Sequence, residues 1–443
     1  YYNYYHWWPA EKGEPPLRLS YFDEEGNAWM YNKSTDSYYL HYFSRKQPDL
    51  NWENPEVRQE IFDMMRFWFD KGIDGFRMDS ISLIAKDPSF PLIDSKKYPD
   101  IFSFYAKEPR LHLYLHEMNR QVLSKYDCMS VGEGSAVMVD DVAKFVDPAR
   151  EELNMLYHFD AARIRNTTLP DNPESGIDYS LIALKKMFTE WDKAVDKGWP
   201  SIYLGNHDQP RMVSRFGSDK DEFRALSAKM LITFLLTMRG TPYWFAGDEI
   251  GMRNIRFDRI EDYNDIDTIN RYKKAKAEGK DPQAVLDEQK ETGRDNARTP
   301  FQWDRSPETG FTAGTPWINV ADEEKDPTSI LNYFKKVVSF RKENPSLIYG
   351  SYHLLDAENP QSYTFLRKTG ADTYLIMLNF SPKAAISTPG IDMSNAHVLL
   401  DNYGDRSHMA PQKDITLRPF EAIVFQLNHP VYESFIDSLD LLE

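Results

Sequence analysis

Three short apolar runs that each end on an acidic residue constrain the fold of this chain most strongly. They are Gly75–Asp79, Cys128–Glu133 and Ser201–Asp208. Each run has the length of a buried strand, and helical patterns lie between the runs. Strands that alternate with helices predict a parallel α/β sheet or barrel. Reactive side chains in such a barrel collect where the strands end, so we expect the three terminal acids to meet at one mouth.

Arg77 lies two residues before Asp79 and therefore points to the same face of its strand. A guanidinium beside a carboxylate keeps the carboxylate ionised, which is what a carboxylate nucleophile needs. This stretch alone is equally typical of a structural ion pair at a strand end. Acids at three strand ends favour a mouth lined with carboxylates, and two carboxylates that flank a bond are the equipment of glycoside cleavage.

Five stretches of the chain resemble signature regions of one enzyme family. Gly75–Asp79, Val131–Glu133 and Asn206–Pro210 resemble, in this order, three regions of the α-amylase family of retaining glycoside hydrolases. Gln47–Trp52 and Arg294–Trp303 are similar to stretches of its oligo-1,6-glucosidase and α-glucosidase branch. The resemblance covers most of the chain and implies a (β/α)8 TIM barrel that removes α-linked glucose from short oligosaccharides through α-1,6 or α-1,4 bonds.

The resemblance also implies roles for individual residues. Asp79 would be the nucleophile and Glu133 the acid/base, while Asp208, His207 and Arg77 would grip the sugar in the transition state. Arg294 is a further expected substrate-binding residue. In the retaining route the two reacting carboxyl groups lie roughly 5 Å apart. Glu133 must then be protonated near neutral pH while Asp79 is ionised.

The order of the patterns predicts the domain organisation. We expect an irregular β-containing subdomain over residues 1–44, inserted in a catalytic barrel whose strands 4–8 occupy residues 45–349. A C-terminal antiparallel β-sandwich follows over residues 350–428, and the tail 429–443 receives no function. Only five barrel strands are found, so we expect the first three to be missing. No cofactor is expected, and a calcium site would lie in that missing part.

Composition limits the partners. A net charge of −16 disfavours nucleic acid, whose phosphates require clustered Lys and Arg. The 26 Tyr, 26 Phe and 10 Trp suit a neutral sugar, because aromatic faces can stack on sugar rings, although most of these side chains are expected in the core. The sequence contains no apolar run long enough to span a bilayer. We therefore expect a cytoplasmic monomer without membrane contact.

Some alternatives remain open at this stage. Ser80 replaces the valine typical of relatives that prefer α-1,6 bonds, so the linkage preference is undecided. Sucrose-isomerising relatives carry an arginine-rich segment where this chain has Phe159–Arg165, and an asparagine where it has Gln209, which makes an isomerase the lesser alternative. Arg211 and Arg215 either anchor their loop, which we favour, or bind substrate. A barrel that binds sugar without catalysis is the alternative that is not an enzyme. Transporter accessory subunits also share this barrel, but they need a membrane anchor and lack the acids, so this chain does not fit them.

Overall fold

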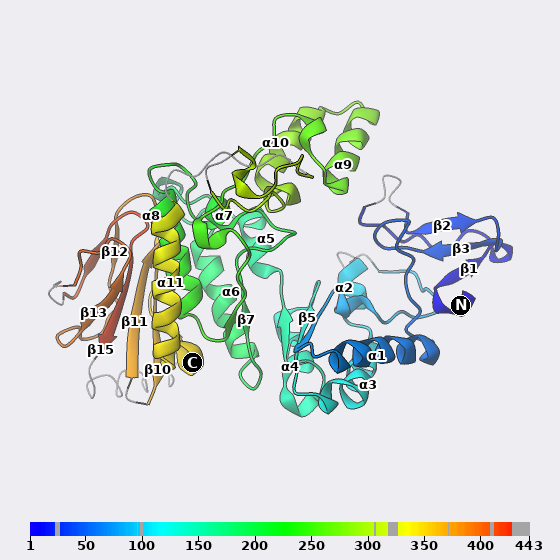
Figure 1. The fold of residues 1–443 in the computed structure, drawn as a ribbon, viewed down its shortest axis with the longest axis horizontal. Helices are drawn as coiled ribbons and strands as arrows, with labels where there is room; N and C mark the ends of the chain where they lie inside the picture. Colours follow the sequence, from blue (N-terminus) through cyan, green and yellow to red (C-terminus); the bar gives the residue numbers. More distant parts are fainter. Residues whose placement is uncertain are drawn as a thin grey trace. The chain divides into compact units, whose positions relative to one another are not determined.

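The computed structural model describes residues 1–22, 27–94, 96–97, 101–304, 307–317, 327–370, 372–407 and 412–427, which Figure 1 traces along the chain. The expected tail 429–443 lies outside these residues. The chain forms two compact units. The first unit comprises Tyr1–Phe159, Ala194–Pro200 and Ile266–Pro282, and the second comprises Asp160–Lys193, Ser201–Asp265 and Gln283–Glu443.

The first unit is built on a parallel sheet with the strand order β4-β5-β6. These strands are β4 (Gly75–Met78), β5 (Met129–Glu133) and β6 (Met155–Tyr157). Met78 lies opposite Gly132, so the residues that follow them, Asp79 directly after β4 and Glu133 as the last residue of β5, lie at the same end of the sheet. Gly75 is required at the start of β4, because a Cβ there would overlap the carbonyl of Met129. The sheet therefore presents both acids at one edge.

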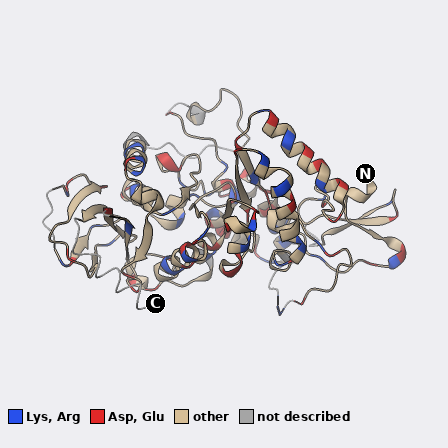
Figure 2. Ribbon diagram, turned by 90° about the horizontal axis from the view of Figure 1, so that it is seen from below, with Lys and Arg blue, Asp and Glu red and all other residues tan. Residues whose placement is uncertain are grey.

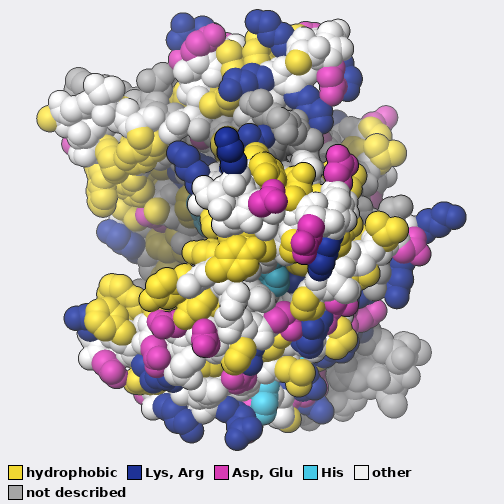
Figure 3. Space-filling view, turned by 90° about the vertical axis from the view of Figure 1, so that its right-hand side faces the viewer, with side chains coloured by type: hydrophobic (Ala, Val, Ile, Leu, Met, Phe, Trp, Pro, Cys, Tyr) yellow, Lys and Arg dark blue, Asp and Glu magenta, His cyan; other side chains and the backbone are white. Residues whose placement is uncertain are grey.

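Helix α1 (Pro55–Asp70) packs against this sheet, where the ring of Phe69 contacts that of Phe76 in β4. It begins at Asn54, whose side chain accepts the N–H of Glu56 at 2.9 Å, and Pro55 occupies the first turn, as is common for helix starts. Its buried residues are Val57, Phe62, Met65 and Phe69. Hydrophobic side chains also reach the surface (Figure 3), and those of α1 are Met64, Phe67 and Trp68. Apolar residues on two sides are typical of a helix that packs against more than one neighbour.

The first unit also contains a small antiparallel sheet with the order β1-β3-β2. Its strands are β1 (Trp7–Pro9), β2 (Trp29–Asn32) and β3 (Ser37–Leu40). An aromatic cluster that includes Trp29, Tyr42 and Tyr105 forms the core beneath it, and Leu83 from the segment after Asp79 packs into the same cluster. The remaining helices of this unit are α2 (Ile101–Tyr105), α3 (Pro109–Gln121), α4 (Ala143–Val146) and α9 (Ile266–Ala277).

The second unit contains two short parallel strands, β7 (Ser201–Ile202) and β8 (Thr241–Pro242). Helix α8 (Arg224–Thr237) is buried along most of its length and packs against α11 (Pro327–Glu343). The other helices are α5 (Asp160–Thr167), α6 (Leu181–Ala194), α7 (Met212–Phe216), α10 (Pro282–Thr292) and α12 (Ser346–Tyr349). In the described part of the chain, β4 to β8 are the five parallel strands that the sequence predicts.

Residues beyond α12 form the predicted antiparallel sheets. A five-stranded sheet has the order β13-β15-β11-β10-β9, and β12 pairs with β14. The bounds are β9 (Ser351–Leu354), β10 (Ser362–Thr369), β11 (Asp372–Asn379), β12 (Ala385–Ser387), β13 (His397–Asp401), β14 (Ile415–Leu417) and β15 (Ala422–Leu427). Leu366, Met377, Leu417 and Phe425 share one core, so both sheets bury their inner faces together. Buried Arg367 donates to the Thr237 and Leu347 carbonyls and fastens this region to α8 and α12.

Residues of both charge signs are distributed along the chain. Figure 2 shows acidic and basic residues interspersed along the helices of the chain. Among the residues described, no helix has the length and apolar character needed to cross a bilayer.

Candidate active site

Arg77 joins two carboxyl groups at the edge of the parallel sheet. Its Nη1 donates to Oδ1 of Asp79, and its Nη2 donates to Oε2 of Glu133 at 3.1 Å. The side chain of Asp79 is 76% exposed, whereas that of Glu133 is only 9% exposed. One carboxyl group is therefore open to an incoming ligand and the other is enclosed. The sequence predicted these three residues, and the structure brings them together within the first unit.

Ser80 helps to hold Glu133 through its backbone. Its N–H donates to Oε2 of Glu133 at 2.9 Å. This requires a sharp turn directly after Asp79, and Ser80 adopts the left-handed conformation with φ 44° and ψ 32°. The turn leads into a 3-10 helix, Ile81–Leu83, whose last carbonyl accepts the ammonium of Lys86 at 2.6 Å. Lys86 in turn forms an ion pair of 2.7 Å with Asp49, so the turn is anchored in the protein interior.

The environment of Glu133 sets its protonation state. Burial raises the pKa of Glu133 to about 7, and the nearby Asp79 carboxylate acts in the same direction. The N–H of Ser80 and the charge of Arg77 oppose this rise. A carboxyl group with a pKa near 7 can donate a proton at neutral pH and accept one later. This is the property that the sequence analysis requires of an acid/base residue.

Asp208 lies beyond its strand in the second unit. Asp208 was expected at a strand end, but β7 stops at Ile202 and Asp208 lies in a turn further along the chain. The side chain of Asn206 accepts the N–H of Asp208 at 2.8 Å, and such a local bond competes with strand pairing. His207 Nε2 lies 3.3 Å from Oδ2 of Asp208, so these two predicted residues contact each other.

Two arginines hold the other oxygen of Asp208. Arg298 Nη2 lies 2.7 Å from Oδ1 and Arg294 Nη1 lies 3.2 Å from the same atom. Arg294 also binds the buried Asp265, through Nε at 2.9 Å. The structure thus places the expected substrate-binding residues His207 and Arg294 beside Asp208. It adds Arg298 and Asp265, which the sequence analysis missed.

A detectable signal existed for one of the two missed residues. Arg298 follows Arg294 by four residues in the same recognised stretch, and both side chains reach Oδ1 of Asp208. Asp265 had no such signal, because it meets these arginines from a distant part of the sequence. Its own N–H donates at 2.8 Å to Asp295, which fixes it beside them.

Arg211 anchors the loop that carries Asp208, as the sequence analysis favoured. Its side chain is buried and donates to the carbonyls of Ala246 at 2.7 Å and Ala297 at 3.1 Å. Arg215 donates to the side chain of Gln209 in the same loop. Asp248 lies 3.9 Å from Arg211, too far for a hydrogen bond, and burial raises its pKa to about 7.

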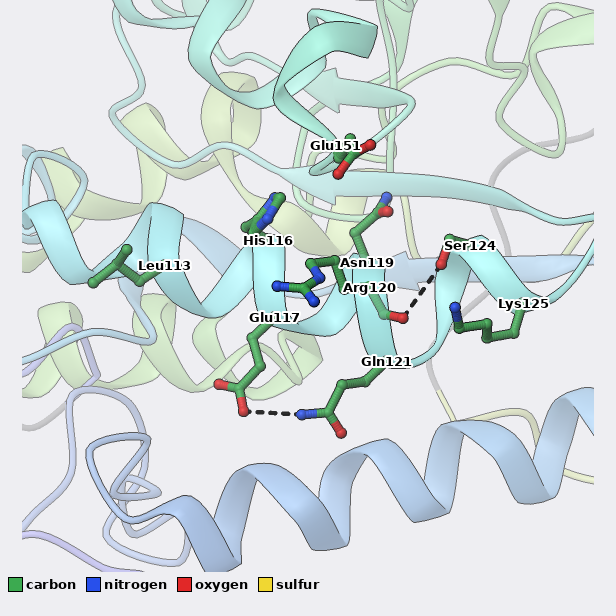
Figure 4. A pocket seen from close by; sticks show the side chains of 9 residues that line it. All are labelled: Leu113, His116, Glu117, Asn119, Arg120, Gln121, Ser124, Lys125 and Glu151. Carbon is green, nitrogen blue, oxygen red and sulfur yellow. Dashed lines mark hydrogen bonds between the residues drawn. The ribbon is translucent and has the colours of Figure 1, made fainter.

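A pocket of about 590 Å³ lies along α3 and does not include the residues above. Its lining residues are Leu113, His116, Glu117, Asn119, Arg120, Gln121, Ser124, Lys125 and Glu151 (Figure 4). The side-chain amide of Gln121 donates a hydrogen bond of 3.1 Å to the carboxylate of Glu117, as Figure 4 shows. Within the described ranges, no group of three or more His, Cys, Asp or Glu side chains has an arrangement that could hold a metal ion.

Comparison with known proteins gives a consistent family. Residues 1–350 match the family model "Alpha amylase, catalytic domain". The oligo-1,6-glucosidase of Parageobacillus thermoglucosidasius is 46% identical over 97% of this chain and 78% of its own length. That of Bacillus cereus is 42% identical over 96% of this chain and 78% of its own length.

A solved structure agrees with these relatives. The isomaltulose synthase of Protaminobacter rubrum superposes with a TM-score of 0.88 at 35% identity, over 97% of this chain and 78% of that one. The family model covers most of the chain, and the relatives exceed 40% identity over nearly all of it. The chain therefore belongs to the α-amylase family, as a glycoside hydrolase of the oligo-1,6-glucosidase type.

Proposed function

We propose that this protein is a retaining α-glucosidase that releases terminal α-linked glucose from short oligosaccharides. The observation that carries the proposal is the single guanidinium of Arg77, shared by an exposed carboxylate and a buried carboxyl group. The exposed Asp79 suits attack, and the buried Glu133, with a pKa of about 7, suits proton transfer. The names of the oligo-1,6-glucosidase relatives support the same substrate class.

The reaction proceeds in two steps. Asp79 attacks the anomeric carbon while Glu133 gives its proton to the departing glycosidic oxygen, which leaves a glucosyl ester on Asp79. Glu133, now ionised, takes a proton from water, and the resulting hydroxide breaks the ester and releases glucose with its original anomeric configuration. Arg77 keeps the two carboxyl groups in position throughout, because it donates to one oxygen of each.

The cluster around Asp208 holds the glucose residue. Asp208 accepts hydrogen bonds from hydroxyl groups of the sugar ring, and His207 also hydrogen-bonds a ring hydroxyl. Arg294 and Arg298 hold the Asp208 carboxylate in place by donating to its Oδ1. The proposal requires this cluster and the Asp79–Glu133 pair to meet at one mouth. It assigns the catalytic barrel to residues 45–349, the inserted subdomain to 1–44 and the β-sandwich to 350–428, in a monomer.

A sucrose isomerase is the second candidate, because solved relatives at 34–36% identity are isomaltulose and trehalulose synthases. The segment Phe159–Arg165 carries two arginines, and Gln209 follows Asp208. By the resemblance described above, both features favour hydrolysis. The oligo-1,6-glucosidases also share the higher identity, 40–46%.

One side-by-side assay separates these functions. Isomaltose, maltose and sucrose are incubated with the enzyme, and the products are followed by proton NMR before mutarotation. A hydrolase with retention yields α-glucose first, and the linkage preference follows from the rates. Initial β-glucose contradicts the two-step route, and conversion of sucrose to an isomeric disaccharide as the main reaction establishes the second candidate.

A further inference from the structure

Four aromatic side chains lie in the segment that follows Arg298. They form two pairs, with ring centroids 4.6 Å apart for Phe301 and Trp303, and 5.1 Å apart for Phe311 and Trp317. Trp303, Phe311 and Trp317 are 69%, 40% and 56% exposed. Exposed aromatic side chains that pack on each other are typical of a surface that binds a ligand or a partner. The four residues are called the aromatic loop surface below.

The aromatic loop surface is fastened to the Asp208 cluster. The N–H of Trp303 donates to the carbonyl of Thr309 at 2.9 Å, which folds the loop back on itself. The indole N–H of Trp317 donates to the carbonyl of Arg298 at 3.0 Å. Arg298 holds Asp208 with its side chain at 2.7 Å. Trp317 is therefore linked to Asp208 through hydrogen bonds that pass through one residue, Arg298.

This attachment determines what Trp317 can offer to a ligand. Its one polar atom already serves the loop, so the part left for recognition is the flat apolar ring. Sugar rings present C–H groups on their faces, and these pack well on an indole or phenyl ring. A neutral oligosaccharide therefore suits this surface better than a charged ligand does.

We propose that the aromatic loop surface binds the sugar rings that lie beyond the glucose held at Asp208, with Trp317 as the principal stacking residue. This inference rests on the proposed function, because it extends the same substrate. It makes the surface a determinant of chain-length preference, since only substrates with further sugar rings can reach it.

Two substitutions of Trp317 separate stacking from anchoring. Trp317→Leu removes both the indole N–H and the flat ring, whereas Trp317→Phe removes the N–H but keeps an aromatic face. KM and kcat are measured with α-glucosyl fluoride, isomaltose and isomaltotriose. A stacking contact of this kind changes binding by roughly threefold to tenfold. We expect Trp317→Leu to raise KM for isomaltotriose by that factor, with the fluoride unchanged and Trp317→Phe close to wild type.

Trp68→Leu is the matched control, because it removes a half-exposed tryptophan from α1 and should leave all three substrates unchanged. Melting curves confirm that each variant is folded. An equal loss on all three substrates, or the same loss in Trp317→Phe, overturns the inference and makes Trp317 a support for Arg298. A wild-type enzyme that releases no glucose from any of them contradicts the proposed function instead.

Discussion

Replacing Arg77 by methionine should move the pH dependence of catalysis in a defined direction. Arg77 Nη2 lies 3.1 Å from Glu133, and its charge opposes the rise in the pKa of Glu133 that burial causes. Without this charge the pKa of Glu133 rises above its present value of about 7. Glu133 acts in its protonated form, so activity is lost when pH exceeds this pKa. The alkaline limb of kcat/KM should therefore move to higher pH.

The magnitude follows from the proximity of the two groups. An opposite charge at this distance changes a carboxyl pKa by about 1 to 3 units in a partly buried site. The alkaline limb should move by at least about one pH unit, which a pH–rate profile resolves easily. The absolute rate should fall as well, because Asp79 loses its ion-pair partner at the same time.

Arg77→Lys is the matched control for charge. Lysine keeps the positive charge but cannot donate to two carboxyl groups in the planar fork of a guanidinium. We expect its alkaline limb to stay close to that of the wild type while kcat falls. The assay is kcat/KM for isomaltose between pH 5 and pH 10. An alkaline limb that stays in place in Arg77→Met, or moves to lower pH, refutes the assignment of Glu133 as the acid.

Three further results are expected. Folding raises the pKa of Glu133 from 4.5 to about 7, so the folded state loses roughly 3 kcal/mol of stability as pH rises through that window. Glu133→Gln cannot ionise, so its melting temperature should exceed that of the wild type by more at pH 8 than at pH 5. An equal difference at both pH values would contradict this. Asp248→Asn, which cannot ionise, should likewise raise the melting temperature over wild type more at pH 8 than at pH 5, because wild-type Asp248, with its pKa of about 7, is ionised only at the higher pH; the same difference at both pH values would speak against this. Ser80→Gly should keep the N–H that binds Glu133 and tolerate φ 44°, whereas Ser80→Val should lose about 1–2 kcal/mol to strain; similar melting temperatures would disprove this.

The sequence was sufficient to predict the first half of the candidate site. Asp79 and Glu133 follow short apolar runs, and parallel strands bring such ends together whatever the details of packing. The conformation of Ser80 was not predictable, because a serine with positive φ is held there by its surroundings. Its backbone contact with Glu133 became visible only in the structure.

The second half of the site was predicted less completely. Asp208 was expected at a strand end, but the side chain of Asn206 replaces strand pairing with a turn. Asp265 was not predicted, because its contact with Arg294 joins residues 29 positions apart in the sequence, one before α9 and the other after α10. The short antiparallel strands after residue 350 were predicted well, since alternation and turn residues encode them locally.

The central claim is that Asp79 forms a covalent bond with the sugar, and chemical trapping tests it most directly. A 5-fluoro-α-glucosyl fluoride enters the first step rapidly but leaves the ester slowly, because the ring fluorine destabilises the oxocarbenium-like transition state while the fluoride leaving group needs no proton. Digestion and tandem mass spectrometry then locate the adduct. The account predicts one fluoroglucosyl group on Asp79, and loss of the adduct in Asp79→Asn. A label on Glu133, on Asp208 or on any other residue contradicts the account.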